Sequence, residues 1–227
     1  MAAFDEKILL VEGPGDRHVM CQLFEAYGTW GNKKSEWPFN ILPCKSNTDL
    51  LGAVLPFHLN ARAARVIGVV LDADFDPTTC WQTFRTIGLQ SFPNIPEAFP
   101  STGLIHDDPR ANRRLGFWMM PDNSQRGMLE TFLQYLIPPD IDSQTTWEFA
   151  KSSAQEALAN QKAPYREVHV DKACIHTWLA WQDPPGQNFG DAISDRCLRP
   201  EVPLARQFIE WLWTLFEIPG QPQLKSK

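Results

Sequence analysis

Two short apolar runs, each followed directly by acidic residues, constrain the fold of this chain more than any other feature. Residues 7–11, KILLV, lead into Glu12 and a Gly-Pro-Gly turn, and residues 65–71, RVIGVVL, lead into an Asp-Ala-Asp sequence. Short apolar runs that end at turn-forming residues predict buried β-strands. We therefore expect two buried strands, each of which places carboxylates at its end.

Strands and helices alternate through the first 125 residues. Asp16 is expected to cap a helix at 17–27, and Pro56 to bend or end a helix at 46–61. A third helix is predicted at 78–87, a loop at 28–37, and further strands at 39–44, 103–106 and 114–120. This alternation predicts an α/β fold with a mostly parallel sheet flanked by helices.

The sequence changes character after Pro138-Pro139, where helical patterns dominate. A helix is predicted at 128–137, before this point, and further helices at 145–160, 171–181, 188–197 and 202–216 after it. We therefore expect an α/β core over residues 1–125, a mainly helical C-terminal extension packed on that core over 126–218, and a disordered tail over 219–227.

Composition excludes several classes of protein. The net charge of -6 argues against passive binding of nucleic acid through a broad basic face, although an enzyme that binds phosphates through metal ions remains compatible with it. The 5 cysteines are scattered and form no CxxC pair, which predicts reduced thiols rather than a disulfide framework or a zinc site. No apolar stretch is long enough to span a bilayer, and the N-terminus does not resemble a signal peptide. We expect a cytoplasmic protein with no membrane partner.

The acidic residues after the two strands suggest a metal site. Ligands bind parallel sheets outside the carboxyl ends of the strands, so Glu12, Asp72 and Asp74 would meet there if their strands are neighbours. Clustered carboxylates repel one another and favour a proton or a cation among them. Oxygen ligands alone suit Mg²⁺ or Mn²⁺, so we expect one of these cations as the cofactor.

Other acids near this edge have a simpler structural interpretation. Asp76 precedes Pro77 and fits a helix cap better than a metal ligand, and Asp16 taken alone does the same. We nevertheless keep Asp16 among the candidate ligands, and Asp76, Asp122 and His18 as candidates for the outer shell of the site.

The two motifs, ILLVEGPGDRHVM and VVLDADFDP, resemble the signature motifs of Toprim domains, the catalytic module of topoisomerases, primases and related nucleases. That family has a glutamate after its first strand and an Asp-x-Asp after its third. The chain order, the gap of about 60 residues and the intervening strand–helix unit are similar here. The resemblance covers residues 6–125 and implies a Toprim-like fold with a metal site at Glu12, Asp72 and Asp74.

The spacing of Glu12 and Asp16 is also similar to that of Toprim nucleases of the OLD type (overcoming lysogenisation defect). In those nucleases further acids and a late lysine complete a two-metal site, which implies roles for Glu130 as a ligand and Lys172 as a catalytic residue. A surface lysine on a helix is the alternative interpretation of Lys172. The segments GFWMMPDNSQRGMLE and DKACIHTWLAWQDPPGQNFG resemble an uncharacterised Toprim-related family of unknown function. Asp74 is followed by Phe-Asp-Pro instead of a glycine turn, which leaves the role of Asp76 open.

These features together predict a Mg²⁺-dependent phosphodiester hydrolase that acts on nucleic acid. Glu12 would act as general base or ligand, and Lys172 would neutralise developing charge. The resemblance implies DNA processing or phage defence. The Gly-Pro-Gly turn is not a P-loop, so a nucleotide-driven step would need a separate ATPase partner. A homodimer is also considered. Arg110, Arg113 and Arg114 are candidate contacts to the phosphate backbone, with a solvated hairpin as the alternative.

Two rival functions remain open at this point. A catalytically inactive binding or regulatory module would keep the fold without turnover. A sugar-nucleotide transferase would use Asp-x-Asp to hold manganese and a diphosphate, but it gives Glu12 no role. A haloacid-dehalogenase phosphatase is disfavoured, because its Asp-x-Asp follows the first strand rather than the third.

Overall fold

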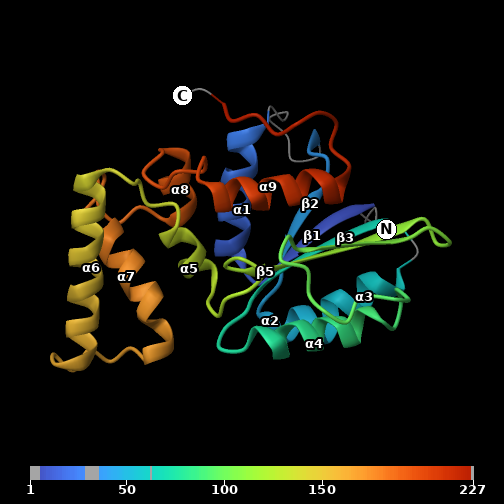
Figure 1. Ribbon diagram of the computed structural model, residues 1–227, viewed down its shortest axis with the longest axis horizontal. Helices are drawn as coiled ribbons and strands as arrows, with labels where there is room; N and C mark the ends of the chain where they lie inside the picture. Colours follow the sequence, from blue (N-terminus) through green and yellow to red (C-terminus); the bar gives the residue numbers. More distant parts are fainter. Residues whose placement is uncertain (1–5, 29–35, 62, 226–227) are drawn as a thin grey trace.

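The described part of the chain contains a five-stranded mixed sheet (Figure 1). A computed structural model describes residues 6–28, 36–61 and 63–225. The strand order is β2-β1-β3-β5-β4, in which β4 is antiparallel to β5 and all other neighbours are parallel. The strands are β1 Lys7–Val11, β2 Asn40–Pro43, β3 Val66–Asp72, β4 Leu104–Asp108 and β5 Arg113–Met120. The prediction of an α/β fold with a mostly parallel sheet is confirmed.

The register of the central strands brings the two acidic motifs together. Leu10 of β1 lies opposite Val69 of β3, and Asp72 at the end of β3 lies opposite Met120 at the end of β5. Because β1, β3 and β5 run parallel, all three end at the same edge of the sheet. The expectation that the strands bearing Glu12 and Asp72 are neighbours is therefore correct.

One face of the sheet packs against the helices that follow β2 and β3. These helices are α2 Asn47–Asp49, the π-helix η2 Leu50–Val54, α3 Leu55–Asn60 and α4 Pro77–Gly88. Alternate strand residues face them, among them Ile8, Leu10, Ile67, Val69 and Phe117. The helical stretch continues past Pro56, with a wider π-helical turn just before α3. Proline has no N–H for an α-helical bond, so this wider turn accommodates it.

The opposite face packs against the first helix and the C-terminal helices. The strand residues on this face include Leu9, Val11, Val70, Trp118 and Met120. The helices in contact with this face are α1 Pro14–Tyr27, α5 Leu129–Gln134 and α9 Pro203–Phe216, and α8 Phe189–Ser194 packs against α1. The helices α6 Ile141–Ala159 and α7 Val170–Leu179, with the 3₁₀ turn η3 Glu167–His169, stand side by side beyond the edge where β1, β3 and β5 end (Figure 1).

The segment after α9 is packed as far as residue 225. Leu224 is partly buried against the core, and the N–H of Lys225 donates to the carbonyl of Ala26 at 2.9 Å. The side chain of Arg196 donates to the carbonyl of Lys225 at 3.1 Å. The expectation of a disordered tail is therefore not met up to this residue. Residues 226–227, and most of the loop predicted at 28–37, lie outside the described residues.

None of the helices in the described ranges has both the length and the apolar composition that a membrane span would need.

Candidate functional site

The two acidic motifs meet at the carboxyl edge of the sheet. Glu12 directly follows β1, and Asp72 is the last residue of β3. The backbone N–H of Asp72 donates to Glu12 Oε1 at 2.9 Å, so the two residues are in direct contact although 60 positions separate them. The juxtaposition expected from the sequence is present.

The loops that follow β3 and β5 are joined to each other at this edge. Asp72 Oδ1 accepts a hydrogen bond of 2.9 Å from the N–H of Leu129, the first residue of α5. Asp74 and Gly127 exchange two backbone hydrogen bonds of 2.8 Å. Gly127 has a φ of 143°, and a Cβ there would lie 2.7 Å from Thr131 Oγ1. A glycine is therefore needed at 127, and the bridge that it forms fixes the position of Asp74.

Asp16 lies in the first turn of α1 and does not cap it. The helix begins at Pro14, earlier than the expected start at residue 17, and its N-cap is Gly13 without a side-chain hydrogen bond. Proline is well suited to the first helical position, because its missing N–H would have no helical acceptor there. The carboxylate of Asp16 turns back toward Gly13, where a Cβ would lie 3.3 Å from Asp16 Oδ2. This carboxylate lines the acidic cleft described below.

Glu130 and Lys172 form an ion pair between α5 and α7. Glu130 is only 6% exposed, and its Oε1 lies 2.8 Å from Nζ of Lys172, a side chain that is 53% exposed. Next to this pair, Thr131 Oγ1 donates to Asp171 Oδ2 at 2.6 Å, which links the same two helices. Lys172 is therefore held at the site by its partner and is not a free surface lysine.

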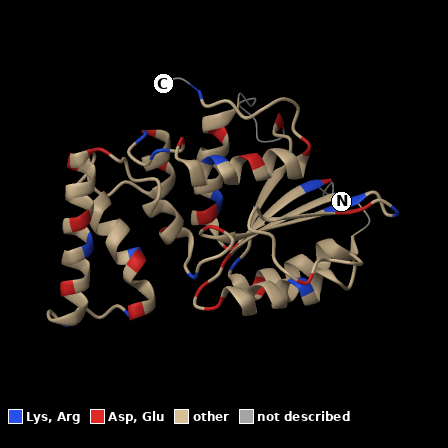
Figure 2. Ribbon diagram, viewed as in Figure 1, with Lys and Arg blue, Asp and Glu red and all other residues tan. Residues whose placement is uncertain are grey.

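These side chains line a single cleft, which we call the acidic cleft. Its volume is about 500 Å³. The acids come from separate segments, and Figure 2 shows red along the loop between β3 and α4 that contributes part of them. The lining residues are Glu12, Asp16, Asp72, Asp74, Phe75, Met128, Leu129, Glu130, Arg166, Val168, His169 and Lys172.

Burial and like charge raise the proton affinity of the acids in this cleft. Burial, followed by the negative charges of Asp16, Asp74 and Glu130, raises the pKa of Glu12 to about 7, and the hydrogen bond from Asp72 opposes the shift. Burial and the nearby Glu12 raise the pKa of Asp72 well above its usual value. Burial also raises the pKa of Asp16 and of Asp74. The cleft is therefore short of positive charge and favours a proton or a cation.

The donor chemistry of the cleft fits a hard divalent cation. The acids offer carboxylate oxygens, which are the ligands that Mg²⁺ and Mn²⁺ prefer. Within the described residues, however, no three His, Cys, Asp or Glu side chains are arranged as a ready metal-binding group. Glu12 and Asp72 each have one oxygen engaged by a backbone N–H, and Glu130 has one engaged by Lys172. The remaining oxygens would have to converge when a cation binds.

The residues expected in the outer shell have other partners. Asp76 caps α4, where its carboxylate accepts from the N–H groups of Thr78 at 3.0 Å and Thr79 at 3.2 Å. Asp122 forms a turn by accepting from the N–H groups of Ser124 and Gln125. His18 pairs with Asp191 at 3.5 Å, on the side of α1 that faces α8. The structure thus departs from the outer-shell role expected for Asp76, Asp122 and His18, because local capping and helix packing occupy them.

The arginines of the hairpin between β4 and β5 are not positioned at the acidic cleft. Arg113 donates to the carbonyls of His58, Leu59 and Ala64 at 2.8–3.1 Å. Arg114 pairs with Asp107 and donates to the carbonyl of Thr214 at 3.0 Å. Both residues begin β5, about 20 Å of strand away from the edge with the acids. Their guanidinium groups are used within the fold. Arg110 lies in the same hairpin, where its N–H donates to Asp108.

Two polar residues of the cleft, Arg166 and His169, were not predicted from the sequence. They precede the predicted Lys172 at intervals of three, and Arg166 Nη2 lies 3.1 Å from His169 Nε2. That spacing places side chains on one face of a helical segment and was the signal available in the sequence. Phe75, which is 67% exposed, also borders the cleft, and no periodic pattern marks it.

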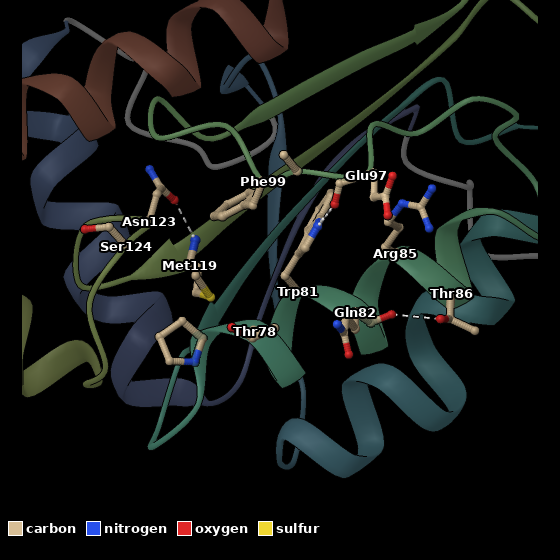
Figure 3. A pocket seen from close by; sticks show the side chains of 12 residues that line it. Thr78, Trp81, Gln82, Arg85, Thr86, Glu97, Phe99, Met119, Asn123 and Ser124 are labelled. Atoms are coloured by element: carbon tan, nitrogen blue, oxygen red, sulfur yellow. Dashed lines mark hydrogen bonds between the residues drawn. The ribbon is translucent and has the colours of Figure 1, made fainter.

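A larger pocket of about 570 Å³ lies beside α4 (Figure 3). Trp81 and Phe99 contribute aromatic rings that stack with centroids 4.8 Å apart, and the indole N–H of Trp81 donates to the carbonyl of Glu97 at 2.8 Å. Asn123 accepts from the N–H of Met119 at 2.9 Å. The aromatic rings, the indole N–H of Trp81 and the side-chain oxygen of Asn123 therefore already have partners within the protein. None of the acids of the acidic cleft lines this pocket.

A family described as "Protein of unknown function (DUF3226)" matches residues 6–217. The chain belongs to this family. The match extends from the residue before β1 to the residue after α9, so it includes both the sheet and the C-terminal helices. Neither a curated protein nor a solved structure matches the chain.

Proposed function

We propose that this protein is a metal-dependent hydrolase of phosphodiester bonds in nucleic acid. The observation that supports the proposal most strongly is the meeting of acids and a lysine from separate segments in one cleft. Their side chains come from the ends of β1 and β3, the first turns of α1 and α5, and α7. The residues with proposed roles are Glu12, Asp16, Asp72, Asp74, Glu130 and Lys172.

The proposed cofactor is Mg²⁺ or Mn²⁺, held by Glu12, Asp16, Asp72, Asp74 and Glu130. Such a cation, when bound, supplies positive charge to phosphate oxygens. The acids of the cleft repel one another, and a cation among them relieves that repulsion. Metal binding should therefore stabilise the folded protein.

Glu12 and Lys172 have complementary roles in the proposed reaction. Glu12 is the proposed general base toward an attacking water, or an additional ligand. Its pKa is raised to about 7 in the metal-free cleft, and a bound cation would lower it. The hydrogen bond to Glu130 raises the pKa of Lys172, which keeps it positively charged. Lys172 would stabilise the negative charge that develops on the phosphate in the transition state.

The resemblance to Toprim domains supports the choice of reaction. It rests on the motifs at Glu12 and at Asp72 with Asp74, and the similarity to OLD-type nucleases extends it to Asp16, Glu130 and Lys172. In this proposal the protein acts in DNA processing or phage defence in the cytoplasm. A separate ATPase would supply any nucleotide-driven step, and a homodimer is compatible with the proposal. A sugar-nucleotide transferase would leave the contact between Glu12 and Asp72 without a function.

The test is a cleavage assay on plasmid DNA, linear DNA and RNA with Mg²⁺ or Mn²⁺. Glu12→Gln should lower the rate about 10²- to 10⁴-fold as a general base is lost. Lys172→Met should lower it about 10²- to 10³-fold as a charge-stabilising group is lost. In parallel, Mg²⁺ should raise the midpoint of thermal unfolding of the wild type and not of Asp72→Asn.

A second ion pair in the chain provides a matched control. Glu148 and Lys151 pair at 2.6 Å on the surface of α6, so Glu148→Gln and Lys151→Met remove the same charges away from the cleft. Both variants should cleave at the wild-type rate. Cleavage that survives Glu12→Gln and Lys172→Met would assign the activity to another site or a contaminant. An absence of both cleavage and metal-induced stabilisation would favour an inactive binding module.

A further inference from the structure

An exposed aromatic residue lies at the junction of two clefts. Phe75 follows Asp74 in the loop between β3 and α4 and is 67% exposed. It lines both the acidic cleft and a second cleft of about 470 Å³, which we call the side cleft. Asp74, Met128 and Val168 also line both clefts. The two clefts therefore adjoin, and Phe75 lies where one leads into the other.

Phe75 has no evident structural role. It belongs to neither hydrophobic core of the described chain. By contrast, Trp81 and Phe99 in the pocket of Figure 3 stack on each other, so each already has a partner. Its exposed ring is therefore accessible to a ligand that enters either cleft.

Each of the two clefts has positive side chains in its lining in addition to its acids, which in the side cleft are Asp74, Glu167 and Asp171. Arg126 lines the side cleft, and Arg166 and Lys172 line the acidic cleft. All three side chains are exposed. A ligand that runs through both clefts would meet a cationic side chain in each and an aromatic face at their junction. This combination suits a chain of phosphates that carries planar, unpaired bases.

We propose that the two clefts together bind a single-stranded segment of nucleic acid, and that one unpaired base stacks on Phe75. This inference rests on the proposed function, because it places the neighbouring phosphate in the acidic cleft. Bases in a duplex are already stacked on their neighbours, so they offer no free face to a side chain at this position. Arg126 would contact the phosphate backbone in the side cleft. The substrate class is therefore an unpaired strand, such as a single-stranded end or overhang, and not blunt duplex.

Binding can be measured without hydrolysis. Fluorescence anisotropy of a labelled single-stranded oligonucleotide and of a blunt duplex of the same sequence is recorded with the full chain in Ca²⁺ in place of Mg²⁺, so that a cation among the carboxylates offsets their repulsion of the phosphate. The wild type should bind the single strand more tightly. Phe75→Ala should weaken that binding about 5- to 100-fold, and Phe75→Trp should restore it, because stacking on one aromatic side chain contributes an affinity of this order.

Phe149→Ala is the matched control, because Phe149 is 64% exposed on α6 and lines neither cleft. It should bind like the wild type. Arg126→Gln should reduce the slope of log affinity against log salt by about 0.7, as expected for one lost contact to a single strand. Equal binding by Phe75→Ala and wild type, or tighter binding to blunt duplex, would overturn the inference.

The same variants separate this inference from the proposed function. If the wild type cleaves nucleic acid but Phe75→Ala cleaves overhangs and blunt ends as the wild type does, the function stands and the inference fails. If the single strand binds in a Phe75-dependent way and no metal supports cleavage, the inference stands and the proposed hydrolysis fails.

Discussion

Glu12 illustrates how a buried carboxylate can line a cleft and at the same time lower the stability of the folded protein. It sits at the end of a buried strand, accepts a hydrogen bond from Asp72, and lies among the negative charges of Asp16, Asp74 and Glu130. The hydrogen bond offsets only part of the cost of burial, because the pKa of Glu12 is still raised to about 7. A carboxylate in this position is unfavourable for folding without a proton or a cation.

The metal-free protein should lose stability as pH rises, and Glu12 should account for part of the loss. Its pKa in the folded state, about 7, lies above the ordinary value of 4.5, so the folded state binds the proton more tightly. The stabilisation is complete below pH 4.5 and is lost as pH rises through 7. Glu12→Gln cannot ionise, so urea unfolding in EDTA should show it to be more stable than the wild type at pH 8.

Glu148→Gln removes an exposed carboxylate on α6 and should leave this pH dependence unchanged. If Glu12→Gln loses as much stability between pH 5 and pH 8 as the wild type does, the pKa of Glu12 is not raised and the account of charge in the cleft is wrong.

At the scale of elements, a close approach between α9 and the sheet determines the position of α9 on the sheet. Gly68 of β3 and Gly116 of β5 are direct neighbours across the two strands. A Cβ at Gly116 would lie 2.5 Å from Leu215 of α9, and one at Gly68 would lie 2.8 Å from the same side chain. The two glycines therefore leave room for Leu215 to reach the sheet.

Gly116→Ala should destabilise the protein by about 1–3 kcal/mol, because the added methyl group forces α9 away from the sheet. Gly52→Ala is the control, because no atom lies within 4 Å of a Cβ added there and the residue is helical. This second variant should gain about 0.5–1 kcal/mol from helix propensity. Urea unfolding of the two variants measures both effects. A neutral result for Gly116→Ala would mean that α9 adjusts its position freely.

At the scale of the whole molecule, one of the two hydrophobic cores joins the sheet to the C-terminal helices. Leu9, Val70 and Trp118 from the strands belong to the same cluster as Phe208 and Phe216 of α9. Phe39, the residue before β2, stacks on Phe216 with ring centroids 3.9 Å apart. One face of the sheet is therefore covered by residues from both halves of the chain.

A chain that ends at residue 125 should not fold cooperatively, because its sheet would expose the face that α5 and α9 cover. Thermal unfolding followed by circular dichroism should show no sharp transition. A chain that ends at residue 218 keeps α9 and loses only the contacts of the last segment, such as that of Lys225 with Ala26, so it should unfold cooperatively at a slightly lower temperature. Cooperative unfolding of residues 1–125 would make the α/β part an independent domain.

Local patterns in the sequence determined the elements and the position of the principal acids. The apolar runs at β1 and β3, the cap at Asp76 and the alternation of strands and helices are properties of short segments, and the structure agrees with them. The placement of Glu12 and Asp72 at one edge also followed, because parallel neighbours end together.

Tertiary packing alone decided which distant side chains share the cleft. The pairing of Glu130 with Lys172 depends on how α5 packs against α7, and the two residues could be suggested from the sequence only through a resemblance. Arg113 and Arg114 were candidate contacts to phosphate, but in the folded protein they donate to backbone carbonyls. No sequence pattern indicated Phe75, whose position between two clefts is known only from the structure. The periodicity of apolar residues indicates which face of a helix or strand a residue occupies. Contacts between distant elements depend instead on how the whole chain packs.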